Sequence, residues 1–180
     1  MVSKPLKNFP FPIGIAHWGI ALCVVGSVIS SLFVDIKNPA SSLPIVIHVR
    51  IGYGVTFFLI FQWLFLSLKK YREVKTHVFP YHFEGRKCMM SDFRLLLKGR
   101  LPPTGARSGL SGLVEGFGIL LITLMALTGL TFHFAEVFDV AKNTPTLFIR
   151  DIHNFFSFFV WAFVIGHGGM ALLHRIIDKE

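Results

Sequence analysis

Charged residues are scarce in this sequence. Only 16% of the 180 residues are Asp, Glu, Lys or Arg, whereas 53% are hydrophobic and 20 are phenylalanine. Soluble globular domains average about 25% charged residues, so the composition excludes an ordinary soluble protein. It is typical of an integral membrane protein.

Acidic residues and cysteines are also few. Ten acidic residues stand against 18 basic ones, which gives a formal net charge of +8. The basic residues must lie outside the apolar segments, so we expect them to contact a membrane surface and expect no nucleic acid partner. The two cysteines, Cys23 in an apolar stretch and Cys88 in a polar one, lack the spacing of a disulfide framework or a zinc site.

Four hydrophobic stretches are long enough to cross a bilayer, which takes about 20 residues in a helix. They cover residues 13–34, 45–68, 116–135 and 152–173, and Arg50 is the only Asp, Glu, Lys or Arg within them. The first stretch lacks a clean cleavage signature, so we predict that it is a retained span. The sequence therefore predicts an all-α integral membrane protein, a four-helix bundle formed by residues 1–180 as a single domain.

The basic residues predict the orientation of this bundle. Ten lie in the polar segment 69–115, two precede the first span at Lys4 and Lys7, and two follow the fourth at Arg175 and Lys179. These 14 of the 18 basic residues fall on one side of a four-span topology. The positive-inside rule then places segment 69–115 and both termini of this multi-pass protein in the cytoplasm. The segment either docks a partner subunit or rests on anionic membrane lipid, and lipid is favoured.

Histidines stand inside or beside the predicted spans, where an ionisable side chain is costly and marks a function. His17 and His167 share a depth near the cytoplasmic side, and His48 and His153 share a depth near the outer side. Because His153 and His167 are 14 residues apart, they project from nearly one face of the fourth span. Haem iron in b-type carriers takes one imidazole from each of two facing helices. The pattern predicts two b-type haems, each held by one of these pairs.

Three further residues are candidates for cofactor binding. Arg50 and Arg150 each lie within three residues of an outer histidine, where a guanidinium can pair with a haem propionate or snorkel to lipid phosphate. His174 follows His167 by one heptad and is a candidate for contact with a propionate or a quinone headgroup. Glycines beside the histidines allow either close approach of a macrocycle or ordinary helix contact. They are Gly14, Gly19, Gly52, Gly54, Gly166, Gly168 and Gly169.

The remaining histidines and one carboxylate receive other predictions. His77 and His82 are expected on the surface of segment 69–115. His133 is expected to have an interfacial or hydrogen-bonding role at the outer end of the third span. Glu115, at the entrance of that span, is expected to be a helix-start carboxylate rather than a relay for quinone protons.

These residues resemble those of the bacterial cytochrome b561 family, which includes the b-type cytochrome subunits of nickel-iron hydrogenases. The resemblance lies in His17-Trp18, in His48 with Gly52 and Tyr53, in the His153 and His167 spacing, and in the tail HGGMALLHRIIDK from His167 to Lys179. It implies a di-haem cytochrome that exchanges electrons with ubiquinone or menaquinone, the four histidines being the axial ligands. A periplasmic cytochrome or dehydrogenase subunit is the implied partner. Some members oxidise superoxide, and the long basic segment is a departure from the shortest ones.

The sequence is compatible with three functions. The first is electron transfer between the quinone pool and a periplasmic donor or acceptor, including a superoxide:quinone oxidoreductase. The second is a haem-bearing membrane anchor subunit of a larger dehydrogenase or hydrogenase-like complex. The third is a haem-free small transporter whose histidines relay protons. If the chain is an enzyme, we expect a quinone-linked oxidoreductase.

Overall fold

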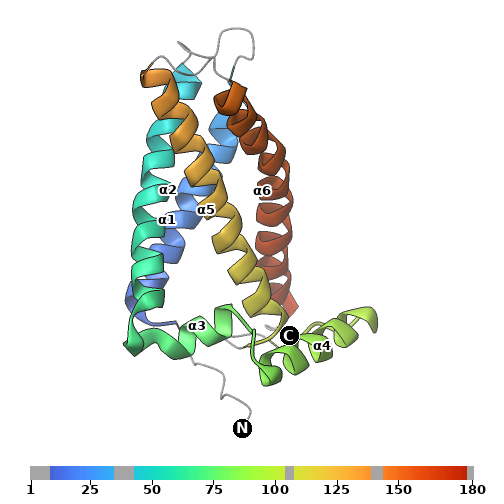
Figure 1. The fold of residues 1–180 in the computed structure, drawn as a ribbon. Helices are drawn as coiled ribbons and strands as arrows, with labels where there is room; N and C mark the ends of the chain where they lie inside the picture. The colour runs from blue at the N-terminus through green and yellow to red at the C-terminus, as the bar shows by residue number, and fades with distance from the viewer. Residues whose placement is uncertain (1–8, 35–42, 104–107, 139–143, 178–180) are drawn as a thin grey trace.

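The computed structural model of the protein describes residues 9–34, 43–103, 108–138 and 144–177, and every secondary-structure element in these ranges is a helix (Figure 1). The elements are α1 (Phe11–Ser31), α2 (Leu43–Ser67), η2 (Lys69–Tyr71), α3 (Arg72–Val78), α4 (Phe83–Leu97), α5 (Leu110–Val137) and α6 (Thr144–Ile177). Four of them, α1, α2, α5 and α6, are long and apolar enough to cross a membrane. The prediction of an all-α, four-span membrane protein is confirmed. The basic residues Lys4, Lys7, Lys37, Arg107, Lys142 and Lys179 lie outside the described residues.

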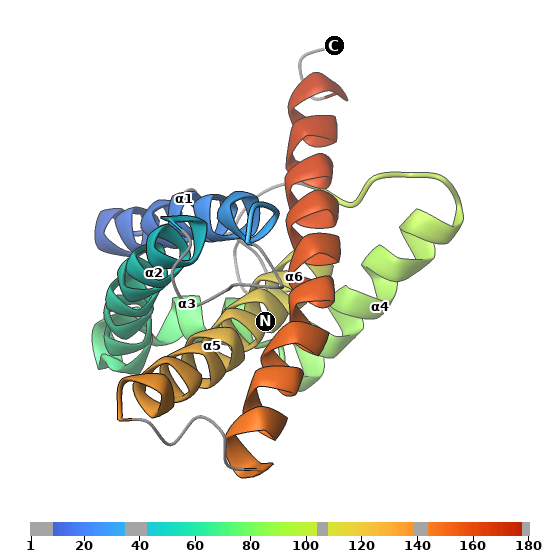
Figure 2. The ribbon, with the colours of Figure 1, turned by 90° about the horizontal axis from the view of Figure 1, so that it is seen from above.

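The four long helices form one bundle in which α1 packs along α2 and α5 packs along α6 (Figures 1 and 2). Contacts between α2 and α5 join the two helix pairs, and α1 touches α6. The start of α1 and the end of α6 lie at the same end of the bundle as α3 and α4 (Figure 1). We call this the lower end and the opposite one the upper end.

Proline marks the start of three of the long helices. Pro12, Pro44 and Pro145 lie in the first turns of α1, α2 and α6. A first-turn residue has no intrahelical partner for its N–H, so proline costs nothing there and sets a helical φ angle. The remaining long helix, α5, begins without proline in its first turn, and there the Leu110 N–H donates to the Asp92 carboxylate at 3.0 Å. A negative charge at that position also favours the helix dipole.

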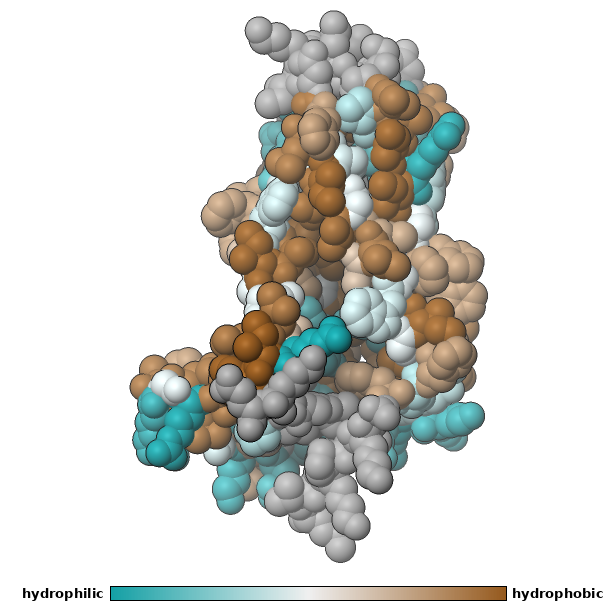
Figure 3. Space-filling model, turned by 180° about the vertical axis from the view of Figure 1, so that it is seen from behind, coloured by the Kyte–Doolittle hydropathy of each residue, from teal (hydrophilic) through white to brown (hydrophobic). Residues whose placement is uncertain are grey.

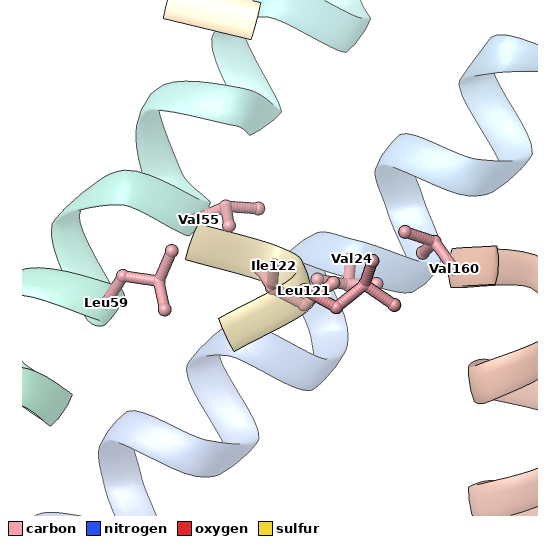
Figure 4. Close-up of a cluster of buried hydrophobic side chains, with 6 residues drawn as sticks. All are labelled: Val24, Val55, Leu59, Leu121, Ile122 and Val160. Carbon is pink, nitrogen blue, oxygen red and sulfur yellow. The ribbon is translucent and has the colours of Figure 1, made fainter. Parts of the chain in front are cut away.

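The centre of the bundle is a cluster of buried aliphatic side chains to which all four long helices contribute (Figure 4). Its members are Val24, Val55, Leu59, Leu121, Ile122 and Val160. Large apolar side chains also cover the outside of the spans, as the brown surface in Figure 3 shows. Trp18 is 66% exposed and Phe158 is 73% exposed. Such a surface fits contact with acyl chains rather than with water.

The described part of segment 69–115, which was predicted to lie outside the membrane, contains the short η2, two α-helices and the start of α5. The first helix, α3, lies across the lower end of the bundle (Figure 1). There it packs against α1 and α2 in a second apolar cluster formed by Ile13, Leu66, Tyr71, Val74 and Val78. The second helix, α4, projects sideways from the same end (Figures 1 and 2). The hydropathy of the segment is low, but α3 buries Val74 and Val78 on one face, whereas the buried residues of α4 are Gly85 and Asp92.

Candidate functional site

Two pairs of histidine rings face one another across the bundle. His17 is exposed, and the other three histidines are half-buried. The rings of His17 in α1 and His167 in α6 have centroids 6.2 Å apart and planes inclined at 67°. The rings of His48 in α2 and His153 in α6 have centroids 6.4 Å apart and planes at 90°. We call His48 and His153 the upper pair, and His17 and His167 the lower pair. The structure thus brings together the residues that the sequence places at matching depths, with α6 contributing to both pairs.

The buried aliphatic cluster separates the two pairs. Val160 follows His153 by seven residues and precedes His167 by seven, which places it about 10 Å along the helix from each. Val24 follows His17 by the same interval. Each histidine pair therefore occupies its own depth in the bundle, with an apolar layer between them.

The ring of His48 is oriented by α1. Its Nδ1 lies 3.0 Å from the backbone oxygen of Ser27 and 3.2 Å from the hydroxyl oxygen of Ser30. A carbonyl oxygen only accepts hydrogen bonds, so Nδ1 carries the proton and donates it. The other ring nitrogen, Nε2, then has an unprotonated lone pair, as a metal-ligating imidazole requires.

The ring of His153 is oriented in the same way by α5. Its Nδ1 lies 3.0 Å from the hydroxyl oxygen of Thr128, and that hydroxyl donates its own proton to the backbone oxygen of Leu124 at 2.8 Å. The Thr128 oxygen can therefore accept from Nδ1, which again leaves Nε2 unprotonated. Gly129 gives the ring room, because a methyl group at this position would lie 3.0 Å from Cε1 of His153.

Aromatic contacts hold the lower pair. Phe163, one helical turn before His167, stacks on its ring with centroids 5.2 Å apart and planes inclined at only 8°. The Phe163 ring rests directly on Gly118 of α5, where any larger residue would collide with it. The ring of Trp18 meets the neighbouring His17 edge to face at 5.9 Å. Hydrogen bonds thus fix the orientation of the upper imidazole rings, and contacts with aromatic rings fix the orientation of the lower ones.

The geometry of both pairs fits a haem iron between the rings. Two metal–nitrogen bonds of about 2 Å, together with the distance from each nitrogen to its ring centre, give a centroid separation of about 6 Å. The observed values are 6.2 and 6.4 Å. Within the described ranges, no three or more His, Cys, Asp or Glu side chains cluster in a way that could hold a metal ion. Two imidazoles are what a porphyrin-bound iron needs, since the macrocycle supplies the other ligands.

The glycines beside the histidines divide into two kinds. Gly19 packs against the ring of Phe58, and a methyl group at Gly54 would lie 3.1 Å from the sulfur of Cys23, so these two serve helix contact. Others border open space, because a methyl group there would meet no atom within 4 Å. They are Gly14, Gly52, Gly166, Gly168 and Gly169. Gly52 lies one turn from His48, so a flat macrocycle has room to approach the backbone of α2 there.

The other candidate cofactor residues lie at the ends of the helices. Arg50 and Arg150 are exposed, and the guanidinium of Arg150 lies 3.3 Å from the carboxylate of its neighbour Asp151. His174 is half-buried in the last turn of α6. The structure brings none of these three side chains into contact with a histidine of either pair.

His133 and Glu115 lie on α5. The ring of His133 contacts the ring of Tyr53 in α2, with centroids 5.9 Å apart, so it joins two spans near the upper end. Glu115 is half-buried in the second turn of the helix.

The prediction that His77 lies on the surface is wrong. Its side chain is 1% exposed, because α3 folds beneath the bundle, and its Nδ1 lies 2.6 Å from the backbone oxygen of Glu73. His82, predicted with it, is half-buried.

Four residues that contact the upper pair were not predicted from the sequence, namely Ser27, Ser30, Thr128 and Gly129. A signal was present, since hydroxyl residues are uncommon in apolar spans and these stand at the depth of the upper histidines. The sequence does not show which helix each hydroxyl faces.

Four apolar helices that carry two facing imidazole pairs define the class of the protein as a membrane-embedded helical bundle suited to bis-histidine haem ligation. The model of the prokaryotic cytochrome b561 family matches residues 8–180, nearly the whole chain. The chain belongs to this family, as the sequence resemblance predicts. It is therefore a membrane b-type cytochrome that binds haem and transfers electrons, and the haem-free transporter is set aside. Comparisons with curated proteins and with solved structures find no match.

Proposed function

We propose that this protein carries single electrons through the membrane by way of two b-type haems, between the quinone pool and a donor or acceptor on the periplasmic side. In this proposal His48 and His153 hold the upper haem, and His17 and His167 hold the lower one. The observation that supports it most is the pairing of four imidazoles at two depths, with ring centroids 6.2 and 6.4 Å apart.

The chemistry follows from the ligand set. Haem iron, when bound, supplies the one-electron redox change, and the protein supplies position and environment. Imidazole on both sides leaves no open coordination position, which favours electron transfer over oxygen binding. The hydrogen bonds that the Nδ1 atoms donate to the Ser27 carbonyl and to the Thr128 hydroxyl keep Nε2 of His48 and His153 unprotonated, so the upper site is organised before haem arrives.

The charge distribution supports a cytoplasmic lower end. Exposed basic residues gather on η2, α3, α4 and the end of α6, whereas the described upper end carries Arg50 and Arg150. By the positive-inside rule, the protein is then a multi-pass protein of the bacterial inner membrane with both termini in the cytoplasm. Residues 1–180 form a single domain in this proposal.

Arg50 and Arg150 are proposed to pair with propionates of the upper haem. Arg150 would exchange its exposed contact with Asp151 for one with a second carboxylate, which costs little because surface ion pairs are weak. His174 is proposed to contact a propionate of the lower haem or a quinone headgroup, since it follows His167 on the same face of α6.

The test is a reduced-minus-oxidised spectrum with haem quantitation on the purified parent and on His153→Ala. We expect two haems per chain in the parent and one in the variant. The matched control is His133→Ala, which removes a histidine of the same region outside both pairs and should keep two. A colourless parent, or a His153→Ala variant that keeps both haems, would refute the proposal.

A further inference from the structure

The exposed side of α4 carries a stripe of large apolar residues. Phe83 is 70% exposed, Met90 50%, Phe93 51% and Leu97 73%. Their intervals of seven, three and four residues place all four on one side of the helix. Among the described elements outside the spans, α4 is the longest helix, and no described residue covers this stripe.

Basic residues flank the stripe. Arg86 projects within it, and Lys87, Arg94 and Lys98 follow its edge, all of them exposed. The two acidic residues of α4 do not offset this positive charge at the exposed surface, because Asp92 is 1% exposed and Glu84 is half-buried. The exposed side of α4 is therefore both apolar and positively charged.

The opposite side of α4 is fixed to the bundle. The Asp92 carboxylate accepts the Leu110 N–H at the start of α5, and a methyl group at the buried Gly85 would lie 2.8 Å from Cβ of Pro80. Figures 1 and 2 show that α4 projects sideways from the lower end of the bundle, at the level where the spans end. Figure 3 shows brown on the side of this arm nearest the spans and teal at its outer end. The stripe is thus held at the depth of a membrane surface.

We propose that α4 lies in the plane of the membrane interface, with its apolar stripe among the acyl chains and its basic residues on anionic phospholipid headgroups. Amphipathic helices with a basic polar side bind membranes in this way, through buried apolar area and attraction to acidic lipids. Long Lys and Arg side chains can reach the headgroups while their stems lie along apolar surface. The fixed, sideways position of α4 means that the stripe meets the lipid around the spans without any rearrangement.

Site-directed spin labelling separates this proposal from its alternatives. Labels are placed by Phe93→Cys and, as the matched control, by Ser91→Cys, in the full chain with Cys23→Ala and Cys88→Ala. Both positions are exposed, but they project to nearly opposite sides of the outward surface of α4. In vesicles of phosphatidylcholine with phosphatidylglycerol, we expect the label at 93 to be accessible to oxygen and shielded from a water-soluble nickel complex, and the label at 91 to show the reverse. Equal accessibility to nickel at both positions would overturn the proposal and favour a missing protein partner.

A charge comparison tests the choice of lipid. Adding phosphatidylglycerol to phosphatidylcholine vesicles should increase the depth of the spin label at position 93 in the membrane. The double substitution Arg94→Gln and Lys98→Gln should abolish that effect. The control pair Arg72→Gln and Lys75→Gln, on α3, should retain it. A depth that does not respond to phosphatidylglycerol would overturn the role of anionic headgroups.

If the cysteine replacements do not give a folded protein, amide hydrogen exchange on the unaltered chain takes their place. The amides of residues 83–97 should exchange at least several-fold more slowly in bilayers containing phosphatidylglycerol than in pure phosphatidylcholine. Equal exchange rates in the two bilayers would overturn the proposal.

Discussion

The Nδ1 atom of His153 lies 3.0 Å from the hydroxyl oxygen of Thr128. This bond joins a histidine of α6 to the neighbouring span, and it is the kind of contact that makes an axial imidazole more basic. A more basic ligand stabilises ferric iron relative to ferrous iron. If His153 holds a haem as proposed, Thr128 therefore bears on the reduction potential of that haem as well as on the position of the ring.

Thr128→Val should raise the midpoint potential of the upper haem. Valine keeps the shape of threonine but removes the acceptor, so the ligand becomes less basic. A hydrogen bond contributes about 0.5–1.5 kcal/mol, and we expect a shift of up to roughly 60 mV for a one-electron couple. Redox titration followed in the visible spectrum measures it. Thr131→Val is the control, because that exposed hydroxyl bonds only to the backbone of Leu127; equal potentials in the two variants would contradict the expectation.

Gly129→Ala should weaken the upper site and spare the lower one. The added methyl group would lie 3.0 Å from Cε1 of His153, so the ring must move away from α5 and from its bond to Thr128. We expect less than two haems per chain, with the loss confined to the upper site. Haem quantitation combined with low-temperature spectra distinguishes the two sites, and the lower haem is the internal control. Loss of both haems in equal measure would instead indicate a general packing defect.

His17→Ala should remove the lower haem and keep the upper one, the reverse of the change expected for His153→Ala. The two pairs lie at separate depths with the aliphatic cluster of Val24 and Val160 between them, so neither site should depend on the other for occupancy. Haem content and the midpoint potential of the remaining haem are the measurements. If His17→Ala lost the same haem as His153→Ala, the assignment of ligands to two pairs would be wrong.

Asp92→Ala should destabilise the lower end of the bundle. Asp92 is 1% exposed and its carboxylate accepts the Leu110 N–H at the start of α5, so its removal takes the side-chain acceptor from a half-buried donor. Such a loss costs about 1–3 kcal/mol. Thermal unfolding of the protein in detergent should show a lower Tm than the parent, and Ser91→Ala, an exposed neighbour, should match the parent. Similar Tm values for the two variants would show that the carboxylate does not fix α4 to α5.

Several helix ends differ from the predicted span limits for one reason. Hydropathy places the start of the fourth span at residue 152, but α6 begins at Thr144 and continues through Arg150 and Asp151. Likewise the third span was predicted from residue 116, whereas α5 begins at Leu110 and includes Glu115. Charged residues interrupt an apolar run without interrupting helical hydrogen bonds, so hydropathy marks the apolar part of a helix and not its ends.

The sequence by itself determined the four apolar helices, because membrane-spanning length and composition are properties of contiguous residues. It also determined the matching depths of the histidines, since a helix converts an interval of 14 residues directly into a distance along its axis. Only the tertiary structure decided that Ser27, Ser30 and Thr128 face the upper histidines, that α3 buries His77, and that the apolar stripe on α4 stays exposed. Each of these depends on how a helix is rotated and which helix lies next to it, and residues distant in the chain set that rotation through packing.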